Sequence, residues 1–334
     1  MCTDFRIKAR DGSVVVGRSM EFALDLKARI CSHPRGEKLE GAAANGAKWT
    51  SVYGFLACEC LDGPHVVDGF NEKGLSVGLL WHPGCAYETA TSAVSAVEVT
   101  QLGAWILGNF STVSELREAL KGVAVLAAEI PGLPEVPPLH VAVHDATGSS
   151  IVIEFVEGEK KIHDNPNGVL TNAPTFDWHI TNLRNYLNLN PSNPGARVLA
   201  GMVLEPPGQG GGLLGIPGDW MPASRFVRAT AMLAFARQPA TADDGVTLAG
   251  HILNAVDIPL GDVRDNAEQL MDFTQWIVIK DLRNKKLYFR SYDSLSMCCI
   301  DLNDIDLGAG VGKRSIPLSA KAKAIAVTAE LQSH

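Results

Sequence analysis

The sequence predicts an α+β fold in which β-sheets are layered with helices. Strand-like runs recur along the chain, pairs of helix-like segments interrupt them, and the 334 residues contain neither an internal repeat nor a clear linker. We therefore expect one domain spanning residues 1–334. The expected strands are 2–9, 13–19, 50–58, 65–69, 75–81, 139–145, 150–156, 274–280 and 286–292. The expected helices are 93–107, the segment between Thr112 and Gly122, 175–187, 225–237 and 241–255.

The first two strands are expected to form a hairpin across Asp11-Gly12, a strong signal for a tight turn. The second strand contains Val14, Val15 and Val16 in succession. Adjacent residues of a strand point to opposite faces, so this apolar run predicts a strand that is covered on both sides.

The helices are predicted from their start signals. Thr112 and Glu115 have the spacing of a capping box. Ser224 is a candidate N-cap for the helix over 225–237. Arg225 and Arg228 lie three residues apart on this helix and so share one face. On spacing alone, the two arginines could equally form a solvated helix face.

A long segment at about 190–219 is predicted to be a loop, because it contains the Gly- and Pro-rich run "EPPGQGGGLLGIPG". Connections inside compact domains are usually much shorter. This length favours a functional or assembly segment over a plain connector.

Composition excludes several classes of partner. The formal net charge is −8 and no run of Lys and Arg occurs, which argues against nucleic acid or an anionic membrane. No stretch approaches 18 uncharged apolar residues, so no membrane span is expected. The first twenty residues lack the pattern of a signal peptide, which predicts a cytoplasmic protein as written, or a periplasmic one if a natural signal peptide is missing from this sequence.

The seven cysteines do not form a disulfide framework, because their number is odd and the chain is large. Their spacing matches no zinc motif, and no paired histidines complete a tetrahedral set. We therefore expect no metal site. All the cysteines except Cys2 are interpreted as small buried apolar residues.

Cys2 stands directly behind Met1, at a position where chains usually fray. Chance is the simplest explanation, since one of seven cysteines can fall anywhere. The alternative is that Met1 is removed, which leaves Cys2 with a thiol and a free α-amine. A residue with both groups is a nucleophile that carries its own base.

The hairpin register offers a test of this alternative. A two-residue turn at Asp11-Gly12 places Glu21 opposite Cys2 on one side of the sheet, where a carboxylate could hold the terminal amine. The same register pairs Arg18 with Phe5 and points it to the other side, unless a bulge shifts it.

Five motifs occur in an order that resembles the choloylglycine hydrolase and penicillin V acylase family of N-terminal-nucleophile amidases. They are "MCT…DG…GRSMEF", "DGFNEKGLSVGL", "NPNGVLTNAPTFDWHITNL", "LGIPGDWMPASRFVRA" and "FTQWIVIKDLRNKKLYFRSYD". The resemblance runs from residue 2 to about residue 302. It implies a four-layer αββα N-terminal-nucleophile hydrolase sandwich that needs no metal or organic cofactor and that commonly forms a homotetramer.

The resemblance also implies catalytic roles. Cys2 matches the nucleophile, and Arg18 matches the arginine beside the thiol, where a cation favours the thiolate. Glu21 stands where the family more often has Asp. Asn172 matches the oxyanion-hole asparagine, although before Ala-Pro it could also be a turn residue. Arg228 matches the active-site arginine, which leaves Arg225 as the structural one.

The resemblance also points to substrate-binding residues. Many bile salt hydrolases have Asn where this chain has Trp81, and an indole there adds an apolar wall to the pocket. An oxyanion hole can still use the backbone N–H of that residue. Trp81 in a β run could instead belong to the core. Phe22 and the loops at 130–138 and 205–216 are further candidates to shape the pocket.

The sequence is therefore interpreted as a cysteine amidase that hydrolyses linear amide bonds of small N-acyl compounds, with a penicillin V acylase-like preference. The alternative within the family is a conjugated bile salt hydrolase. Spacing cannot separate these substrates from N-acyl homoserine lactones. From a different class, a redox-active thiol or ligand-binding protein would use Cys2 without amide chemistry.

Overall fold

The computed structural model describes residues 1–40, 48–89, 95–266, 269–319 and 328. Within these ranges two large antiparallel sheets dominate the fold. The first sheet has the strand order β14 (Val169–Leu170), β1 (Cys2–Lys8), β2 (Val14–Phe22), β18 (Met271–Asp281), β19 (Lys286–Ser291) and β20 (Cys298–Asp301), with β17 (Val263–Arg264) beside β18. The second sheet has the order β13 (Glu159–Asp164), β12 (Ser150–Val156), β11 (Leu139–His144), β8 (Ser76–Trp81), β7 (His65–Asn71), β6 (Phe55–Cys60), β3 (Arg29–His33) and β21 (Arg314–Pro317).

The other described elements are helices, short 3₁₀ turns and small strand pairs. The helices are α1 (Val99–Asn109), α2 (Val113–Ala119), α3 (Phe176–Asn182), α4 (Pro222–Phe235) and α5 (Ala242–Asn254). Short 3₁₀ turns cover Leu120–Gly122, Leu183–Tyr186, Gly211–Leu213 and Leu302–Asp304. The small strand pairs are β4 (Lys38–Glu40) with β5 (Lys48–Thr50), β9 (Ser95–Glu98) with β10 (Val123–Leu126), and β15 (Arg197–Leu199) with β16 (Met202–Leu204).

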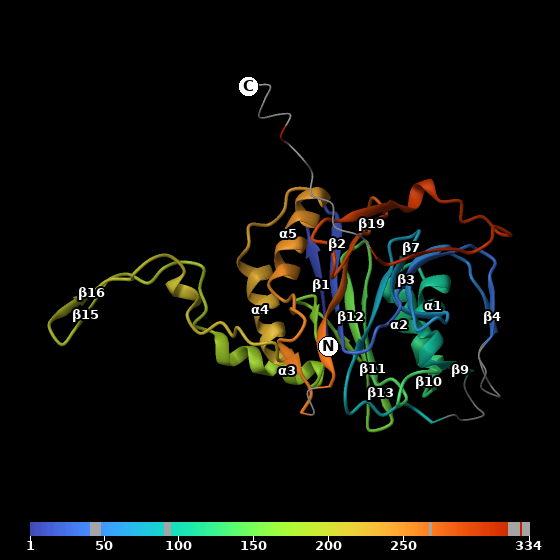
Figure 1. Ribbon diagram of the computed structural model, residues 1–334, viewed down its shortest axis with the longest axis horizontal. Coiled ribbons are helices and arrows are strands. Elements are labelled where there is room, and N and C mark those ends of the chain that lie inside the picture. The colour runs from blue at the N-terminus through green and yellow to red at the C-terminus, as the bar shows by residue number, and fades with distance from the viewer. Residues whose placement is uncertain (41–47, 90–94, 267–268, 320–327, 329–334) are drawn as a thin grey trace.

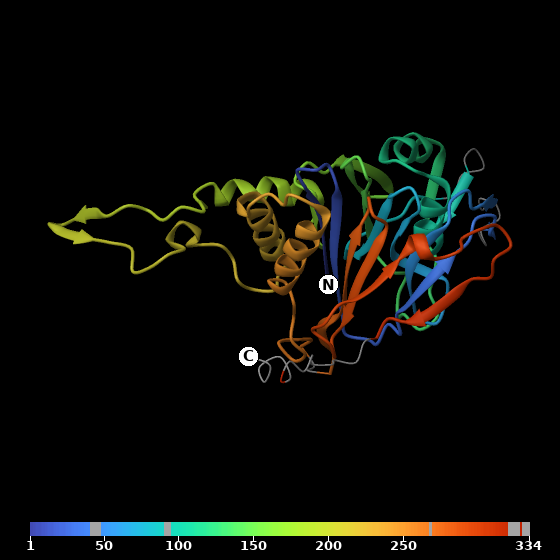
Figure 2. The ribbon, with the colours of Figure 1, turned by 90° about the horizontal axis from the view of Figure 1, so that it is seen from above.

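The two sheets pack face to face between two layers of helices (Figures 1 and 2). Helices α4 and α5 cover the outer face of the first sheet, and α1 packs on the second. One hydrophobic core lies on both faces of the first sheet, against α4 and α5 on one side and against the second sheet on the other. Another lies between the second sheet and the helices α1 and α2. The predicted four-layer αββα sandwich is confirmed.

The apolar run of β2 is buried as predicted. Val14, Val15 and Val16 are each at most 2% exposed. The reason is that β2 lies between β1 and β18 inside the first sheet, while α5 packs across it. This strand and its neighbour β1 therefore form a rigid support for Cys2.

The hairpin register predicted from Asp11-Gly12 is wrong by one residue. Ala9 donates its N–H to the carbonyl of Ser13 at 2.9 Å, so the turn contains three residues, and Gly12 takes a left-handed φ of 82°. Cys2 consequently pairs with Met20, and Arg18 pairs with Asp4. The shift moves Arg18 to the same face of the sheet as Cys2 and moves Glu21 to the opposite face.

Two helix starts also differ from the prediction. The segment from Ser95 is a strand, and α1 begins at Val99, while residues 93–94 of the expected helix lie outside the described residues. Helix α4 begins with Pro222, a residue that suits the first helical position. Its N-cap is therefore Met221, and the Ser224 hydroxyl donates instead to Asp219 at 2.8 Å.

The expected loop at 190–219 contains the hairpin β15–β16 at the tip of an arm that projects from the body of the protein (Figures 1 and 2). The strands are short, and their side chains are exposed. In the described ranges, no helix has both the length and the apolar character that crossing a bilayer requires.

Candidate active site

Cys2 lies at the start of β1, where the two sheets meet. Its side chain is 2% exposed, and its thiol lies 3.7 Å from the sulfur of Met20, its partner on β2. The thiol also lines a pocket between the sheets. A buried thiol at a pocket wall can be reached by a substrate while bulk water is kept away.

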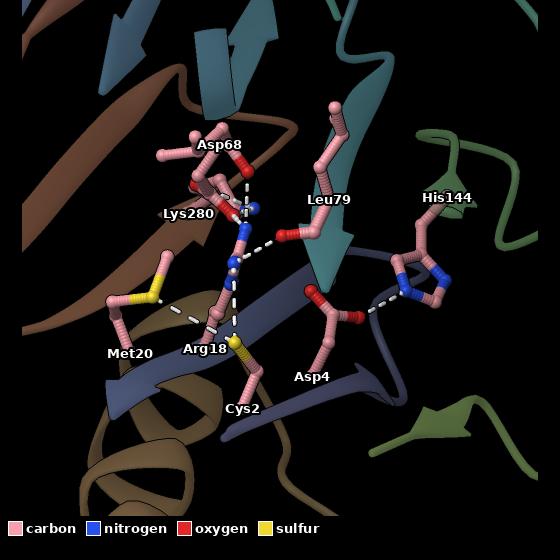
Figure 3. A network of polar contacts seen from close by, with 9 residues as sticks. Cys2, Asp4, Arg18, Met20, Asp68, Leu79, His144 and Lys280 are labelled. Atoms are coloured by element: carbon pink, nitrogen blue, oxygen red, sulfur yellow. Dashed lines mark hydrogen bonds and ion pairs between the residues drawn. The ribbon is translucent and has the colours of Figure 1, made fainter. Parts of the chain in front are cut away.

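Arg18 is the cation next to this thiol (Figure 3). Its Nη2 lies 3.6 Å from Cys2 Sγ and also donates to the carbonyl of Leu79. The guanidinium is fully buried. Burial alone would lower the pKa of Arg18, but the negative groups around it raise that pKa. Arg18 is therefore a fixed positive charge beside the Cys2 sulfur.

Asn172 is brought to Cys2 by strand β14. Leu170 pairs with Asp4, and continuing this antiparallel register places Asn172 opposite Cys2. Asn172 Oδ1 accepts the backbone N–H of Cys2 at 2.8 Å, and its Nδ2 donates to the carbonyl of Trp81 at 2.6 Å. The amide nitrogen carries a second hydrogen, which can be donated to a substrate oxygen.

Arg225, rather than Arg228, contacts Cys2. Its Nη1 donates to the Cys2 carbonyl and, at 2.6 Å, to Thr3 Oγ1, and its Nη2 donates to Asn172 Oδ1 at 2.7 Å. Arg228 points elsewhere, because it donates to the carbonyls of Ala255 at 2.9 Å and Pro217 at 2.7 Å. The placement expected for these two arginines is therefore reversed.

Glu21 lies on the helix side of the first sheet, away from the thiol. Its carboxylate accepts the Thr274 hydroxyl at 3.1 Å and is fully buried. Burial raises the pKa of Glu21, and the positive charges of Arg225 and the chain terminus oppose that rise. The expected position of Glu21 directly opposite Cys2 is wrong, although its charge still acts near the terminus.

The pocket beside Cys2 is apolar and small, with a volume of about 50 Å³. Trp81 and Phe22 line it and contact each other edge to face, with ring centroids 5.2 Å apart. Ile130, Leu133 and Pro137 contribute from the expected loop at 130–138. None of the described lining residues comes from 205–216. A volume of this size holds only a few water molecules, so an acyl group requires the pocket to widen.

Behind Asn172 lies a buried polar cluster that the sequence did not predict. His179 Nε2 donates to the Asn172 carbonyl at 2.8 Å, and His140 Nε2 donates to the Thr171 carbonyl at 3.1 Å. Glu154 faces His140 Nδ1 at 3.2 Å. These contacts fix the backbone on both sides of Asn172. Scattered histidines carry no sequence signal for such a role.

His82, His140 and Glu154 are the described residues whose spacing could hold a metal ion. The rings of His82 and His140 stack, with centroids 4.5 Å apart and planes within 17°. Lone pairs of two parallel rings cannot converge on one ion, and both His140 nitrogens already face protein partners. The geometry therefore favours a structural cluster over a metal site.

Comparisons with known proteins identify the family of this chain. Residues 2–316 match the linear amide C–N hydrolases of the choloylglycine hydrolase family. The chain is 34% identical over 317 residues to a bile salt hydrolase/transferase from Clostridium perfringens, which covers 92% of this chain and 94% of the relative. It is 27% identical over 314 residues to a penicillin V acylase from Pectobacterium atrosepticum, covering 87% and 78% respectively.

Among solved structures, a variant of conjugated bile acid hydrolase from Clostridium perfringens matches with a TM-score of 0.88 at 31% identity, over 98% of this chain and 100% of that chain. The fold and the site thus define a hydrolase of linear amide C–N bonds. The chain belongs to the choloylglycine hydrolase family.

Proposed function

We propose that Cys2 is the nucleophile of this amidase and that it acts after Met1 is removed. The observation that carries the proposal is the surroundings of Cys2. Its sulfur lies 3.6 Å from Arg18 Nη2 and lines an apolar pocket, while its nitrogen donates to Asn172 Oδ1 at 2.8 Å. A free α-amine at that nitrogen has an ordinary pKa of about 8, so about a tenth of it is unprotonated at pH 7 and about half at pH 8.

Each step of hydrolysis then has a group to perform it. The α-amine takes the thiol proton, directly or through a water, and Cys2 Sγ attacks the acyl carbon. Asn172 Nδ2 and a backbone N–H near Trp81 hold the oxyanion. The amine returns its proton to the leaving nitrogen, the C–N bond breaks, and water releases the acid from the thioester.

Arg225 supports this arrangement from the helix side. It holds both the Cys2 carbonyl and Asn172 Oδ1, so one guanidinium fixes the nucleophile residue relative to the oxyanion donor. Arg228 holds residues 217–219 in front of α4. We therefore assign the active-site arginine to Arg225 and a structural role to Arg228.

The substrate we propose is a small N-acyl amide with an aryl or alkyl acyl group, such as the phenoxyacetyl group of penicillin V. The edge-to-face pair of Trp81 and Phe22 offers this group an aromatic wall. A conjugated bile salt is the second candidate, favoured by the higher identity to the bile salt hydrolase/transferase than to the penicillin V acylase.

The test combines mass and activity. Intact mass should show a chain that begins at Cys2, and a brief reaction with penicillin V should add the acyl mass to the peptide that contains Cys2. Cys2→Ser should lose most activity, because a hydroxyl ionises far less readily than a thiol. The matched control is Cys299→Ser, since Cys299 is exposed. Full activity with Met1 retained, or in Cys2→Ser, would refute the proposal.

The same experiment separates the redox alternative. Cys60 lines the pocket of Cys2, so the structure offers the second thiol that a peroxide-reacting protein would use. Burial raises the pKa of Cys60 to about 12, however, which makes it a poor partner at neutral pH. A Cys2–Cys60 disulfide that forms when peroxide is added, without any acyl adduct from penicillin V, would support the redox function instead.

We also propose that residues 1–334 act as one amidase domain whose arm assembles a homotetramer. The side chains of Val198, Leu199, Met202 and Val203 on the arm are between 57% and 72% exposed. An apolar patch of this kind is typical of an interface. Val198→Ser with Val203→Ser should lower the molecular mass seen by light scattering, and an unchanged mass would contradict this assignment.

A further inference from the structure

Beneath Cys2 lies a buried group of charges of which the proposed reaction uses only Arg18. Arg18 from β2, Asp68 from β7 and Lys280 from β18 meet between the two sheets (Figure 3). All three side chains are fully buried. Charges without access to water are costly unless they are paired, so the arrangement requires a reason.

The contacts show how the charges are shared. Lys280 Nζ donates to both oxygens of Asp68 at 2.8 Å. Arg18 Nη1 lies farther away, at 3.3 Å from Asp68 Oδ2, and also donates to the carbonyl of Val67. Asp68 is thus held mainly by Lys280, while the other end of the Arg18 guanidinium faces the Cys2 sulfur.

The charge balance depends on Lys280. Arg18 paired with Asp68 alone would present no net charge to the sulfur. Lys280 adds a second positive charge, so the three groups together carry +1. Because these groups are shielded from water, the Coulomb interaction between this charge and a thiolate is screened far less than it would be in water. Lys280 therefore lets Arg18 stabilise the thiolate in spite of Asp68.

A second acidic group adds another negative charge near the Cys2 sulfur. Asp4 shares the face of Cys2, and its Oδ1 faces His144 Nε2 at 2.7 Å. Burial lowers the pKa of His144, which favours the neutral ring. A Cβ built at Gly78 would lie 3.0 Å from Asp4 Oδ2 and 3.4 Å from Arg18 Nη1, so the group is compact. Without Lys280, two carboxylates would face a single guanidinium.

The ionisable groups around Cys2 come from six parts of the fold. They are Asp4, Arg18 and Glu21 from its own hairpin, Cys60, His65 and Asp68 from β6 and β7, His144 from β11, Arg225 from α4 and Lys280 from β18. Among them Lys280 is the cation that binds the carboxylate next to Arg18.

We propose that Asp68 and Lys280 are positioning residues of the amidase: Lys280 holds Asp68 so that the Arg18 guanidinium keeps its charge directed at the Cys2 sulfur. This inference rests on the proposed role of Cys2 as nucleophile. Neither residue touches the substrate pocket, since neither lines it among the described residues.

The experiment measures how fast iodoacetamide alkylates Cys2 as a function of pH, read by mass on the Cys2 peptide. Lys280→Met should move the midpoint of this profile upward by about one pH unit or more, since one unit corresponds to about 1.4 kcal/mol. Asp68→Asn should move it downward. The double variant removes one charge of each sign and should return the midpoint close to that of the wild type.

The controls separate charge from packing. Lys280→Arg keeps the charge and should keep the midpoint, and Lys160→Met removes a lysine that pairs with Glu88 away from Cys2. The proposal would be overturned if neither single variant changed the alkylation midpoint. It would also be overturned if the double variant showed the same shift as Lys280→Met. The double variant removes the Lys280–Asp68 ion pair as a whole, so it remains informative if a single variant does not fold.

Amide hydrolysis is measured in parallel, which distinguishes the two proposals. If the acid limb of kcat/KM moves with the alkylation midpoint while KM stays constant, both proposals hold. If the alkylation midpoint moves but Cys2→Ser still hydrolyses the amide, the network acts on Cys2 and the nucleophile lies elsewhere.

Discussion

The Asn172 side chain joins three parts of the site. Its Oδ1 accepts from Cys2 and Arg225, and its Nδ2 donates to the carbonyl of Trp81. The amide thereby links the first sheet, helix α4 and the end of β8. A turn residue before a proline would not need these three contacts, so the geometry favours a role in the reaction.

We therefore expect Asn172→Ala to lower kcat by about 10²–10³, the usual cost of removing one oxyanion donor, with a smaller effect on KM. Steady-state kinetics with penicillin V would measure both constants. Asn167→Ala is the matched control, because Asn167 donates to Thr230 at 3.0 Å on a neighbouring part of the same segment. A normal kcat in Asn172→Ala would return Asn172 to the role of a turn residue.

The sequence could not predict which of Arg225 and Arg228 contacts Cys2. Both residues lie on one helical face, three positions apart, and spacing alone could not rank them. The order of motifs assigned the active-site role to Arg228, whereas Arg225 is the arginine that contacts Cys2 in the structure. The choice depends on how α4 sits on β1, which a sequence pattern does not contain.

His82 gives the site a pH-dependent stability. Burial, followed by the charge of neighbouring His140, lowers the pKa of His82 from 6.5 to about 4. The unfolded chain therefore binds the proton more readily than the folded one. The contribution of His82 to stability is complete above pH 6.5 and is lost as the pH falls toward 4.

Replacing His82 by Phe keeps a ring stacked on His140 and removes the titration. Between pH 6.5 and 4.5 the free energy of unfolding should fall by about 2 kcal/mol less in His82→Phe than in the wild type. Urea unfolding at both pH values measures this difference. The exposed His251, replaced in the same way, should leave the pH dependence unchanged, and an equal effect of both variants would contradict the assignment.

At the scale of elements, the first hairpin shows what turn chemistry can and cannot predict. The Asp11-Gly12 signal correctly predicted both strands. It did not distinguish a two-residue turn from a three-residue turn that ends in a left-handed glycine. A register error of one residue moves every side chain to the other face. That error separated Arg18 from Cys2 and joined Glu21 to it.

Strand β2 also contains a glycine that its neighbour requires. Gly17 pairs with Phe5, and a Cβ at Gly17 would lie 2.5 Å from the Phe5 ring. We expect Gly17→Ala to destabilise the protein by about 1–3 kcal/mol, the usual cost of overpacking a buried site. Urea unfolding would measure it. Gly122→Ala serves as control, since a Cβ there meets no atom within 4 Å; equal effects of the two changes would refute this explanation.

At the scale of the whole molecule, the layers could be predicted but their contacts could not. Recurrent strands and paired helices predicted sheets covered by helices, and the order of motifs predicted the four layers. Asp68 and Lys280 are 212 positions apart and meet only because β7 and β18 belong to sheets that face each other. The charge network therefore could not be predicted from the sequence, because it depends on how the two sheets pack against each other.

The arm shows the same limit. Its Gly- and Pro-rich composition predicted an irregular segment, and its length favoured a functional or assembly segment over a plain connector. The short strands β15 and β16 pair at its tip, with exposed apolar side chains that no core explains. No part of the chain that the structure describes buries them.

Substrate preference is also a property of the whole molecule, because the pocket forms where the two sheets meet. Phe22 comes from the first sheet and Trp81 from the second, and Leu133 closes the pocket from a loop. An aryl or alkyl acyl group gains contact with the indole face. A hydroxylated steroid amide finds no amide side chain at Trp81, so it lacks one hydrogen-bonding partner.

We therefore expect the wild type to cleave penicillin V with a higher kcat/KM than glycocholate, and Trp81→Asn to move this ratio toward glycocholate. The change removes aromatic surface and adds an amide, and a ratio of specificity constants cancels any loss of folded enzyme. Trp178→Asn is the control, because the exposed Trp178 lies on α3 and is not among the residues that line the pocket. A wild type that prefers glycocholate, or a ratio that Trp81→Asn leaves unmoved, would show that preference is set by the loop and Phe22 instead.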